Sequence, residues 1–169
     1  PKPSSAASDV YKRQLQRGTF WAVTAVKVCM TTQLLIREKY AFELLTLEVF
    51  LPGLSWELIQ KKREALRDAF CDFDPDLIAD FDEDDIGYLM SDPRLIRNRR
   101  KIEAVITNAK AAVAMRKEWT LPELIHHVLE KDHFKDGLSL TAYLRPYGFV
   151  YIGPTTMQGL LDLATSSSQ

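Results

Sequence analysis

The sequence predicts an all-α fold built as an orthogonal array of short helices, and three observations predict it. From Glu38 onward, apolar residues recur at spacings of three and four, the period of a helix that buries one face. Signals that start or stop helices follow one another at short intervals. The 169 residues, 46% of them hydrophobic and 27% charged, suit one globular domain.

The first predicted helices lie on either side of a Pro-Gly turn. Residues 38–51 carry apolar residues without a glycine, and Pro52-Gly53 ends this stretch. Ser55 is a suitable N-cap for a helix over 55–70, which has one apolar and one basic face. Before them, residues 19–36 are rich in apolar and β-branched residues, which leaves both a strand pair and a buried helix open.

Shorter helices are expected to follow. Asp74-Pro75 places a cap and then a proline at the first helical position, and another short helix covers 82–90 until Ser91-Asp92-Pro93 breaks it. The clearest helical period runs over 100–116. Further helices are expected over 121–131, over 139–146 and up to about Ala164, with residues 148–153 as a short extended piece.

These elements predict one helical domain over residues 38–164. Residues 1–14 contain two prolines and a Ser/Ala cluster without an apolar period, so we interpret them as a disordered or non-native leader. Residues 15–37 form an N-terminal segment and residues 165–169 a C-terminal tail.

Composition restricts the classes of function. No uncharged apolar run approaches the roughly 18 residues that a membrane span needs. Two cysteines, Cys29 and Cys71, cannot build a disulfide framework, so we expect a cytoplasmic protein in a reducing compartment. The 22 Lys and Arg residues against 23 Asp and Glu give a net charge of −1, which by itself argues against a nucleic-acid binder.

Charge is nevertheless segregated along the chain. Five cations (Arg94, Arg97, Arg99, Arg100 and Lys101) lie at the expected start of the helix over 100–116. A helix N-terminus offers free N–H groups and a positive dipole end, which suit a phosphate. A solvated basic turn is the alternative, and so is neutralisation by the five acids within residues 80–85.

Glu48 and Trp56 stand on either side of the Pro-Gly turn. Glu48 lies among apolar residues, so its carboxyl either occupies a narrow polar stripe or is buried with a raised pKa. The Trp56 ring is either a core aromatic or a flat surface for stacking. His126 and His127 have no adjacent nucleophile, and we interpret them as helix-surface residues.

Three segments have the order and spacing of motifs in a known family. They are LEVFLPGLSWELIQKKREALRDAFCDFDPDLIA (47–79), DPRLIRNRRKIEAVITNAKA (92–111) and YGFVYIGPTT (147–156). Together they resemble the DNA-3-methyladenine glycosylase I family of helix-hairpin-helix base-excision enzymes. The resemblance implies a helix-hairpin-helix motif and an enzyme that flips 3-methyladenine out of alkylated DNA and hydrolyses its N-glycosidic bond, leaving an abasic site.

The same resemblance implies a role for each site residue. Glu48 would be the catalytic and base-binding carboxylate, which favours the cationic 3-methyladenine over neutral adenine. Trp56 would stack on the flipped base. Gly53 and Leu54 would form the wedge at the lesion. The phosphate-binding hairpin would comprise Ile96, Arg97, Asn98, Arg99, Arg100 and Lys101.

Both ends of the chain depart from the family pattern. The family's N-terminal Cys-x-Trp and Tyr-His-Asp-x-Glu-Trp-Gly segments, which supply zinc ligands and a stacking Tyr, have no counterpart in residues 15–40, and the C-terminal His and Cys are also missing. We therefore expect no cofactor and no metal site of this kind. Residues 119–121 lack the catalytic Asp of many related enzymes, which favours a monofunctional glycosylase. We expect a monomer that binds double-stranded DNA with alkylated bases and no membrane.

Two other functions stay open. A catalytically impaired helix-hairpin-helix DNA-binding protein would bind phosphates without a complete base pocket and would not prefer damaged DNA. A helical protein-interaction domain would not bind DNA even at low salt.

Overall fold

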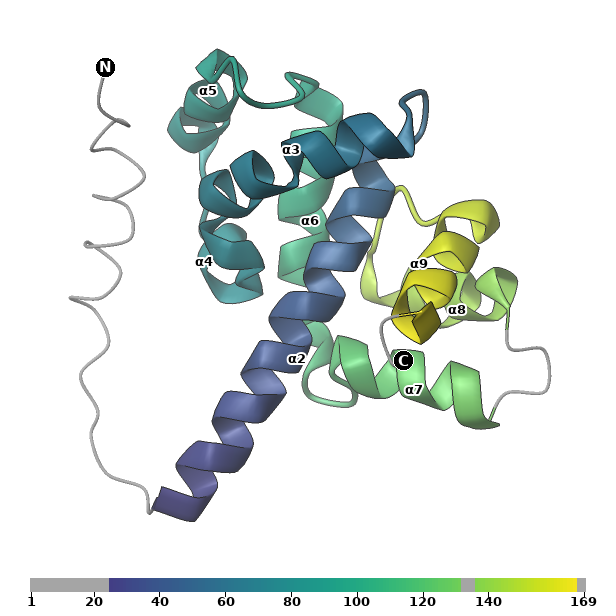
Figure 1. The fold of residues 1–169 in the computed structure, drawn as a ribbon. Helices are drawn as coiled ribbons and strands as arrows, with labels where there is room; N and C mark the ends of the chain where they lie inside the picture. Colours follow the sequence, from purple (N-terminus) through teal and green to yellow (C-terminus); the bar gives the residue numbers. More distant parts are fainter. Residues whose placement is uncertain (1–24, 132–135, 167–169) are drawn as a thin grey trace.

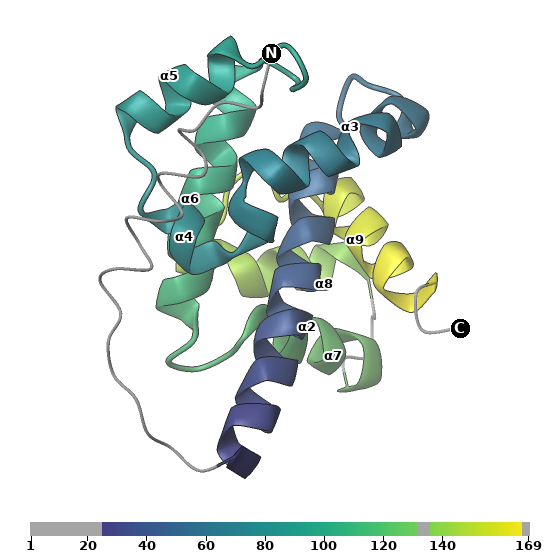
Figure 2. The ribbon, with the colours of Figure 1, turned by 60° about the vertical axis from the view of Figure 1, so that its left-hand side comes forward.

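The computed structural model describes residues 25–131 and 136–166, and these residues form helices joined by short turns without any β-strand. The predicted all-α class is confirmed. The longest helix, α2, runs through the molecule with α3 to α6 on one side and α7 to α9 on the other (Figures 1 and 2). The bounds are α2 (Ala25–Phe50), α3 (Trp56–Ala69), α4 (Pro75–Ala79), α5 (Glu83–Ser91), α6 (Arg99–Met115), α7 (Leu121–Lys131), α8 (Gly137–Leu144) and α9 (Pro154–Ser166).

The described part of the ambiguous segment 19–36 is helical. α2 begins at Ala25 and continues without a break to Phe50, which excludes the strand alternative for residues 25–36. Residues 1–24 lie outside the described residues, so the predicted leader over 1–14 and the boundary at 37 stay predictions. At the other end, α9 reaches Ser166 and thus includes the first two residues of the expected tail.

Local capping signals place the helix starts close to the predicted positions. The Ser55 hydroxyl accepts from Leu58 N at 3.2 Å and caps α3, and Asp74 caps α4 with Pro75 as its first residue. Asp82 and Asp85 form a capping box at the start of α5. The predicted helix over 139–146 is divided into α8 and a 3₁₀ turn, Arg145–Tyr147.

The hydrophobic core lies around the second half of α2, where every residue from 41 to 50 is buried. Phe50 packs against Phe70, and Phe70 against Phe81, with ring centroids 6.2 and 6.3 Å apart. α4 packs on α6, and α8 packs on α9. Between α3 and α4, Cys71–Phe73 form a left-handed turn with φ values of 51°, 57° and 54°.

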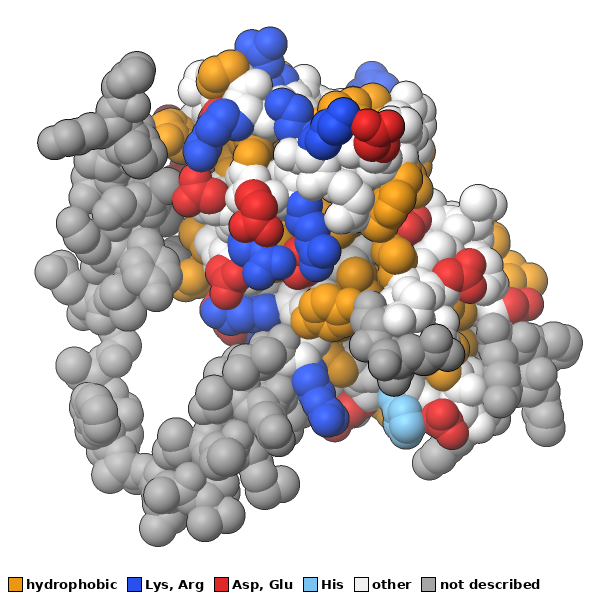
Figure 3. All heavy atoms as spheres, in the orientation of Figure 1, with side chains coloured by type: hydrophobic (Ala, Val, Ile, Leu, Met, Phe, Trp, Pro, Cys, Tyr) orange, Lys and Arg blue, Asp and Glu red, His pale blue; other side chains and the backbone are white. Residues whose placement is uncertain are grey.

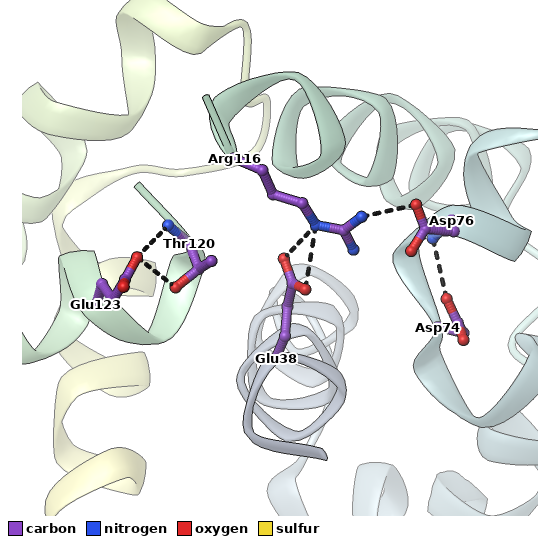
Figure 4. A network of polar contacts seen from close by, with 6 residues as sticks. All are labelled: Glu38, Asp74, Asp76, Arg116, Thr120 and Glu123. Carbon is purple, nitrogen blue, oxygen red and sulfur yellow. Dashed lines mark hydrogen bonds and ion pairs between the residues drawn. The ribbon is translucent and has the colours of Figure 1, made fainter. Parts of the chain in front are cut away.

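Ion pairs between helices supplement this core. Arg116, which follows α6, donates from Nε to both oxygens of Glu38 on α2 (2.9 and 3.1 Å) and from Nη1 to Asp76 on α4 at 2.7 Å (Figure 4). Glu38 is only 4% exposed. This network therefore joins three helices through one guanidinium.

Acidic and basic side chains lie beside one another over much of the face shown in Figure 3. Among the ion pairs of the described residues, Arg63 and Arg67 of α3 both reach Glu43 of α2, at 2.6 and 2.8 Å. Among the described helices, none combines the length and apolar character needed to cross a lipid bilayer.

Candidate active site and nucleic-acid interface

Glu48 is buried in the last turn of α2, two residues before its end, with 5% of its surface exposed. Its carboxyl forms no hydrogen bond with any described residue. Burial, together with the negative charge of Asp162 on α9, raises the pKa of Glu48 from 4.5 to about 7. Of the two alternatives left open by the sequence, the buried carboxyl with a raised pKa is the one found.

The Pro-Gly turn places Trp56 close to Glu48 in the chain and at the surface. Leu54 N donates to Leu51 O at 2.8 Å, and Gly53 adopts a left-handed φ of +83°, which favours glycine. Leu54 is half-buried against the core, while Gly53 is exposed. Trp56, the first residue of α3, is 38% exposed, so its ring is not a core aromatic and retains surface for stacking.

The five cations within residues 94–101, around the start of α6, have different surroundings. Arg94 pairs with Asp92 and Asp68, and Arg99 pairs with Glu83 and Glu103. Glu83, one of the five acids within residues 80–85, thus neutralises one of the five cations, which is part of the neutralisation considered as an alternative. Arg97 and Arg100 are exposed and form no ion pair with a described residue.

The remaining hairpin residues shape the start of α6. The Asn98 side chain accepts from Lys101 N at 3.3 Å and caps the helix, and Ile96 is half-buried against the core. α5 and α6 pack against each other on either side of residues 92–98. The designation of this pair as a helix-hairpin-helix motif stays a prediction.

The Lys101 side chain differs from the expectation of a phosphate contact. It is only 8% exposed, and its ammonium donates to the carbonyl oxygens of Phe50 at 2.7 Å and Pro52 at 2.6 Å. The physical reason is that the end of α2 leaves carbonyls without helical partners within reach of this ammonium. Around Lys101, the groups that remain suited to a phosphate are the backbone N–H groups at the helix start and the exposed Arg97 and Arg100.

The segment 147–156 is held against α6. The Asn108 side chain exchanges two hydrogen bonds with the backbone of Val150, at 2.8 and 3.1 Å. Phe149 and Ile152 are buried, and Tyr151 is exposed with a φ of +58°. His126 is exposed, whereas His127 is half-buried between the rings of Trp119 and Tyr143. Among the described side chains, no three His, Cys, Asp or Glu groups are arranged to hold a metal ion.

Comparison with known proteins identifies the family. The family model described as methyladenine glycosylase matches residues 32–164. The chain belongs to this family. It is 39% identical over 139 residues to the DNA-3-methyladenine glycosylase of Haemophilus influenzae, covering 72% of this chain and 74% of that protein. It is 44% identical over 77 residues to DNA-3-methyladenine glycosylase 1 of Escherichia coli, covering 46% of this chain and 41% of that protein.

A solved structure of the same family is also similar. It is the 3-methyladenine DNA glycosylase I of Staphylococcus aureus, described in terms of the structural basis of 3-methyladenine recognition. The sequences are 32% identical, the TM-score is 0.68, and the match covers 75% of this chain and 76% of the other. These comparisons confirm the predicted helical fold and the predicted membership of the methyladenine glycosylase family.

Sequence reasoning missed the part of α9 that lies against Glu48. A Cβ atom added to Gly159 would lie 2.6 to 2.7 Å from the three carboxyl atoms of Glu48, so the carboxyl rests directly on the glycine. Asp162, one turn further along, contributes to the raised pKa of Glu48. A glycine inside a helical pattern signals a close approach, and this signal was available in residues 154–164.

Gly159→Ala is expected to move the Glu48 carboxyl while leaving the fold intact. The atoms that a methyl group would meet are the far end of a flexible side chain. We therefore expect the carboxyl to shift away from α9 and toward solvent. The pH midpoint of base release should therefore fall below about 7, because the burial that raises the pKa of Glu48 is relieved. A pH–rate profile of base release measures this midpoint.

Gly87→Ala on α5 is the matched control, since a Cβ there would meet nothing within 4 Å. Both substitutions gain about 0.5–1 kcal/mol of helix propensity. An unchanged pH midpoint in Gly159→Ala would show that the contact with Gly159 does not set the state of Glu48.

Proposed function

We propose that this chain hydrolyses the N-glycosidic bond of 3-methyladenine in alkylated double-stranded DNA and leaves an abasic site. The observation that carries the proposal is the buried Glu48 carboxyl, without a hydrogen-bond partner among the described residues, next to a turn that exposes Trp56. Such a carboxylate has its acceptors free for a ligand. The names of the similar proteins support the same substrate.

The proposed chemistry depends on charge. 3-Methyladenine is cationic while attached to the sugar and is already a good leaving group, so strong acid catalysis is unnecessary. An ionised Glu48 in a site with little water stabilises that cation and does not favour neutral adenine in the same way. Trp56 would add stacking worth about 1–3 kcal/mol.

The proposed DNA contacts use the exposed elements around the same turn. Gly53 allows close approach of the backbone, and Leu54 would enter the gap that the flipped base leaves. Arg97, Arg100 and the N–H groups at the start of α6 would bind phosphates. We also propose that the enzyme acts as a monofunctional monomer in the cytoplasm and without a metal or other cofactor.

The test is release of 3-methyladenine from methylated duplex DNA by the purified chain, followed by chromatography of the free base. We expect release in proportion to enzyme concentration and no release of adenine from unmodified DNA. Salt-sensitive duplex binding without any base release would instead support the alternative of a catalytically impaired DNA-binding protein, which the kinship with named glycosylases does not favour.

A further inference from the structure

We propose that Lys101 is a positioning residue that ties the start of α6 to the Pro52-Gly53 turn and thereby holds the base site in shape. Its consequence for catalysis rests on the proposed function, whereas the tie itself rests on geometry alone. Lys101 is separated in sequence from Phe50 by 51 residues and from Pro52 by 49, so no local signal places them together.

Lys101 donates its two hydrogen bonds to carbonyls that lie between Glu48 and Trp56 in the chain. Phe50 is the last residue of α2, two residues after Glu48, and Pro52 stands four residues before Trp56. Carbonyls at the end of a helix lack helical partners, and a lysine ammonium offers three N–H donors to satisfy them. One buried cation thus binds the short stretch of chain that joins Glu48 to Trp56.

Because Lys101 is buried, its ammonium binds groups inside the protein and not a ligand at the surface. Taking an ammonium out of water is costly unless it is well hydrogen-bonded, and the two short bonds to the carbonyls at 2.7 and 2.6 Å offset that cost. Desolvation also lowers the pKa of Lys101. An ammonium oriented in this way points into the protein and not toward a phosphate outside it.

The tip of the turn that Lys101 holds is open to solvent. Gly53 is exposed, and a Cβ there would meet nothing within 4 Å. Lys101 lies in the first turn of α6, within the segment proposed to bind phosphates. The hairpin and the wedge therefore share one connection, so DNA held by the hairpin meets Leu54 in a defined place.

Lys101→Met in the full chain tests the tie, because methionine keeps the length and apolar stem but has no donor. We expect amide hydrogen exchange over residues 50–58 to accelerate at least tenfold, with exchange over residues 75–91 unchanged. We also expect base release to slow about 10- to 100-fold, since small displacements of a catalytic group are that costly. The salt dependence of duplex binding should keep its slope.

Arg100→Met is the matched control, since Arg100 is exposed and adjacent in sequence. Loss of a phosphate contact there should reduce the slope of log K against log salt by about 1 and leave exchange over residues 50–58 unchanged. If Lys101→Met instead reduces the slope by about 1 with unchanged exchange, Lys101 is a phosphate contact and the proposal is overturned.

Two further results would also bear on the role of Lys101. If Lys101→Met does not fold, Lys101→Arg, which retains donors for both carbonyls, should restore folding and slow exchange over residues 50–58, and failure to do so overturns the proposal. If the unaltered chain releases no 3-methyladenine, the proposed function fails, while the exchange measurement still decides whether Lys101 holds the turn.

Discussion

Glu48→Gln is expected to lower the rate of 3-methyladenine release at least tenfold and to raise the stability of the protein at neutral pH. The carboxylate is the charge that favours the cationic base, and an amide of the same shape lacks it. Glutamine also removes a buried charge that has no hydrogen-bond partner among the described residues. Loss of activity together with a gain of stability distinguishes a site residue from a structural one.

The pH dependence follows from the pKa of Glu48, which burial raises from 4.5 to about 7. Base release should therefore increase as the pH rises through about 7, since more of Glu48 is then ionised. In Glu48→Gln this rise should be absent. A pH–rate profile from 5.5 to 8.5 under single-turnover conditions measures both.

The stability of the wild-type protein changes with pH in the opposite direction to its rate of base release. Between pH 4.5 and 7 the folded protein retains a proton that the unfolded chain has released, so Glu48 makes the wild type less stable as the pH rises through this window. The free energy of unfolding of Glu48→Gln relative to wild type should rise by about 1–3 kcal/mol between pH 4 and pH 8.

Glu64→Gln on α3 is the control for this experiment, since the Glu64 side chain is 85% exposed and forms only a long contact with Arg67. It should change the free energy of unfolding by less than about 0.5 kcal/mol and leave base release unchanged. Equal release rates for Glu48→Gln and wild type would contradict the proposed role of Glu48.

Arg116→Met is expected to destabilise the protein by about 3 kcal/mol. It leaves the Glu38 carboxylate, whose side chain is 5% exposed, without the guanidinium that donates its two hydrogen bonds from described residues (Figure 4). It also removes the ion pair between Arg116, which follows α6, and Asp76 on α4. Urea unfolding followed by circular dichroism at pH 7 measures the change.

Two companion variants identify the cause. Glu38→Gln combined with Arg116→Met should recover much of the loss, because removing both charges leaves no buried charge uncompensated. Lys61→Met, which breaks an exposed pair with Glu57, should cost less than about 1 kcal/mol. A loss in Arg116→Met no larger than in Lys61→Met would mean that the network contributes little.

Much of the fold follows from local signals in the sequence. Ser55, Asp74 with Pro75, and the apolar period of 100–116 predict α3, α4 and α6, because caps and helical periodicity act over a few residues. The left-handed turn at Cys71–Phe73 has no such signal, since it contains no glycine. Burial of Phe73 in the core holds that backbone in place.

The features of the candidate site likewise divide into those with a signal in the sequence and those that depend on tertiary packing. The family resemblance, the helical class and the choice of Glu48 and Trp56 are all predictable from the sequence, because they depend on residue identity and spacing along the chain. The structure alone decided that Glu48 rests on Gly159, that Arg99 pairs with Glu83, and that the Lys101 ammonium binds the end of α2. Each of these contacts joins residues 16 to 111 positions apart, and side chains so distant meet only when helices pack, so no short-range pattern encodes where they point.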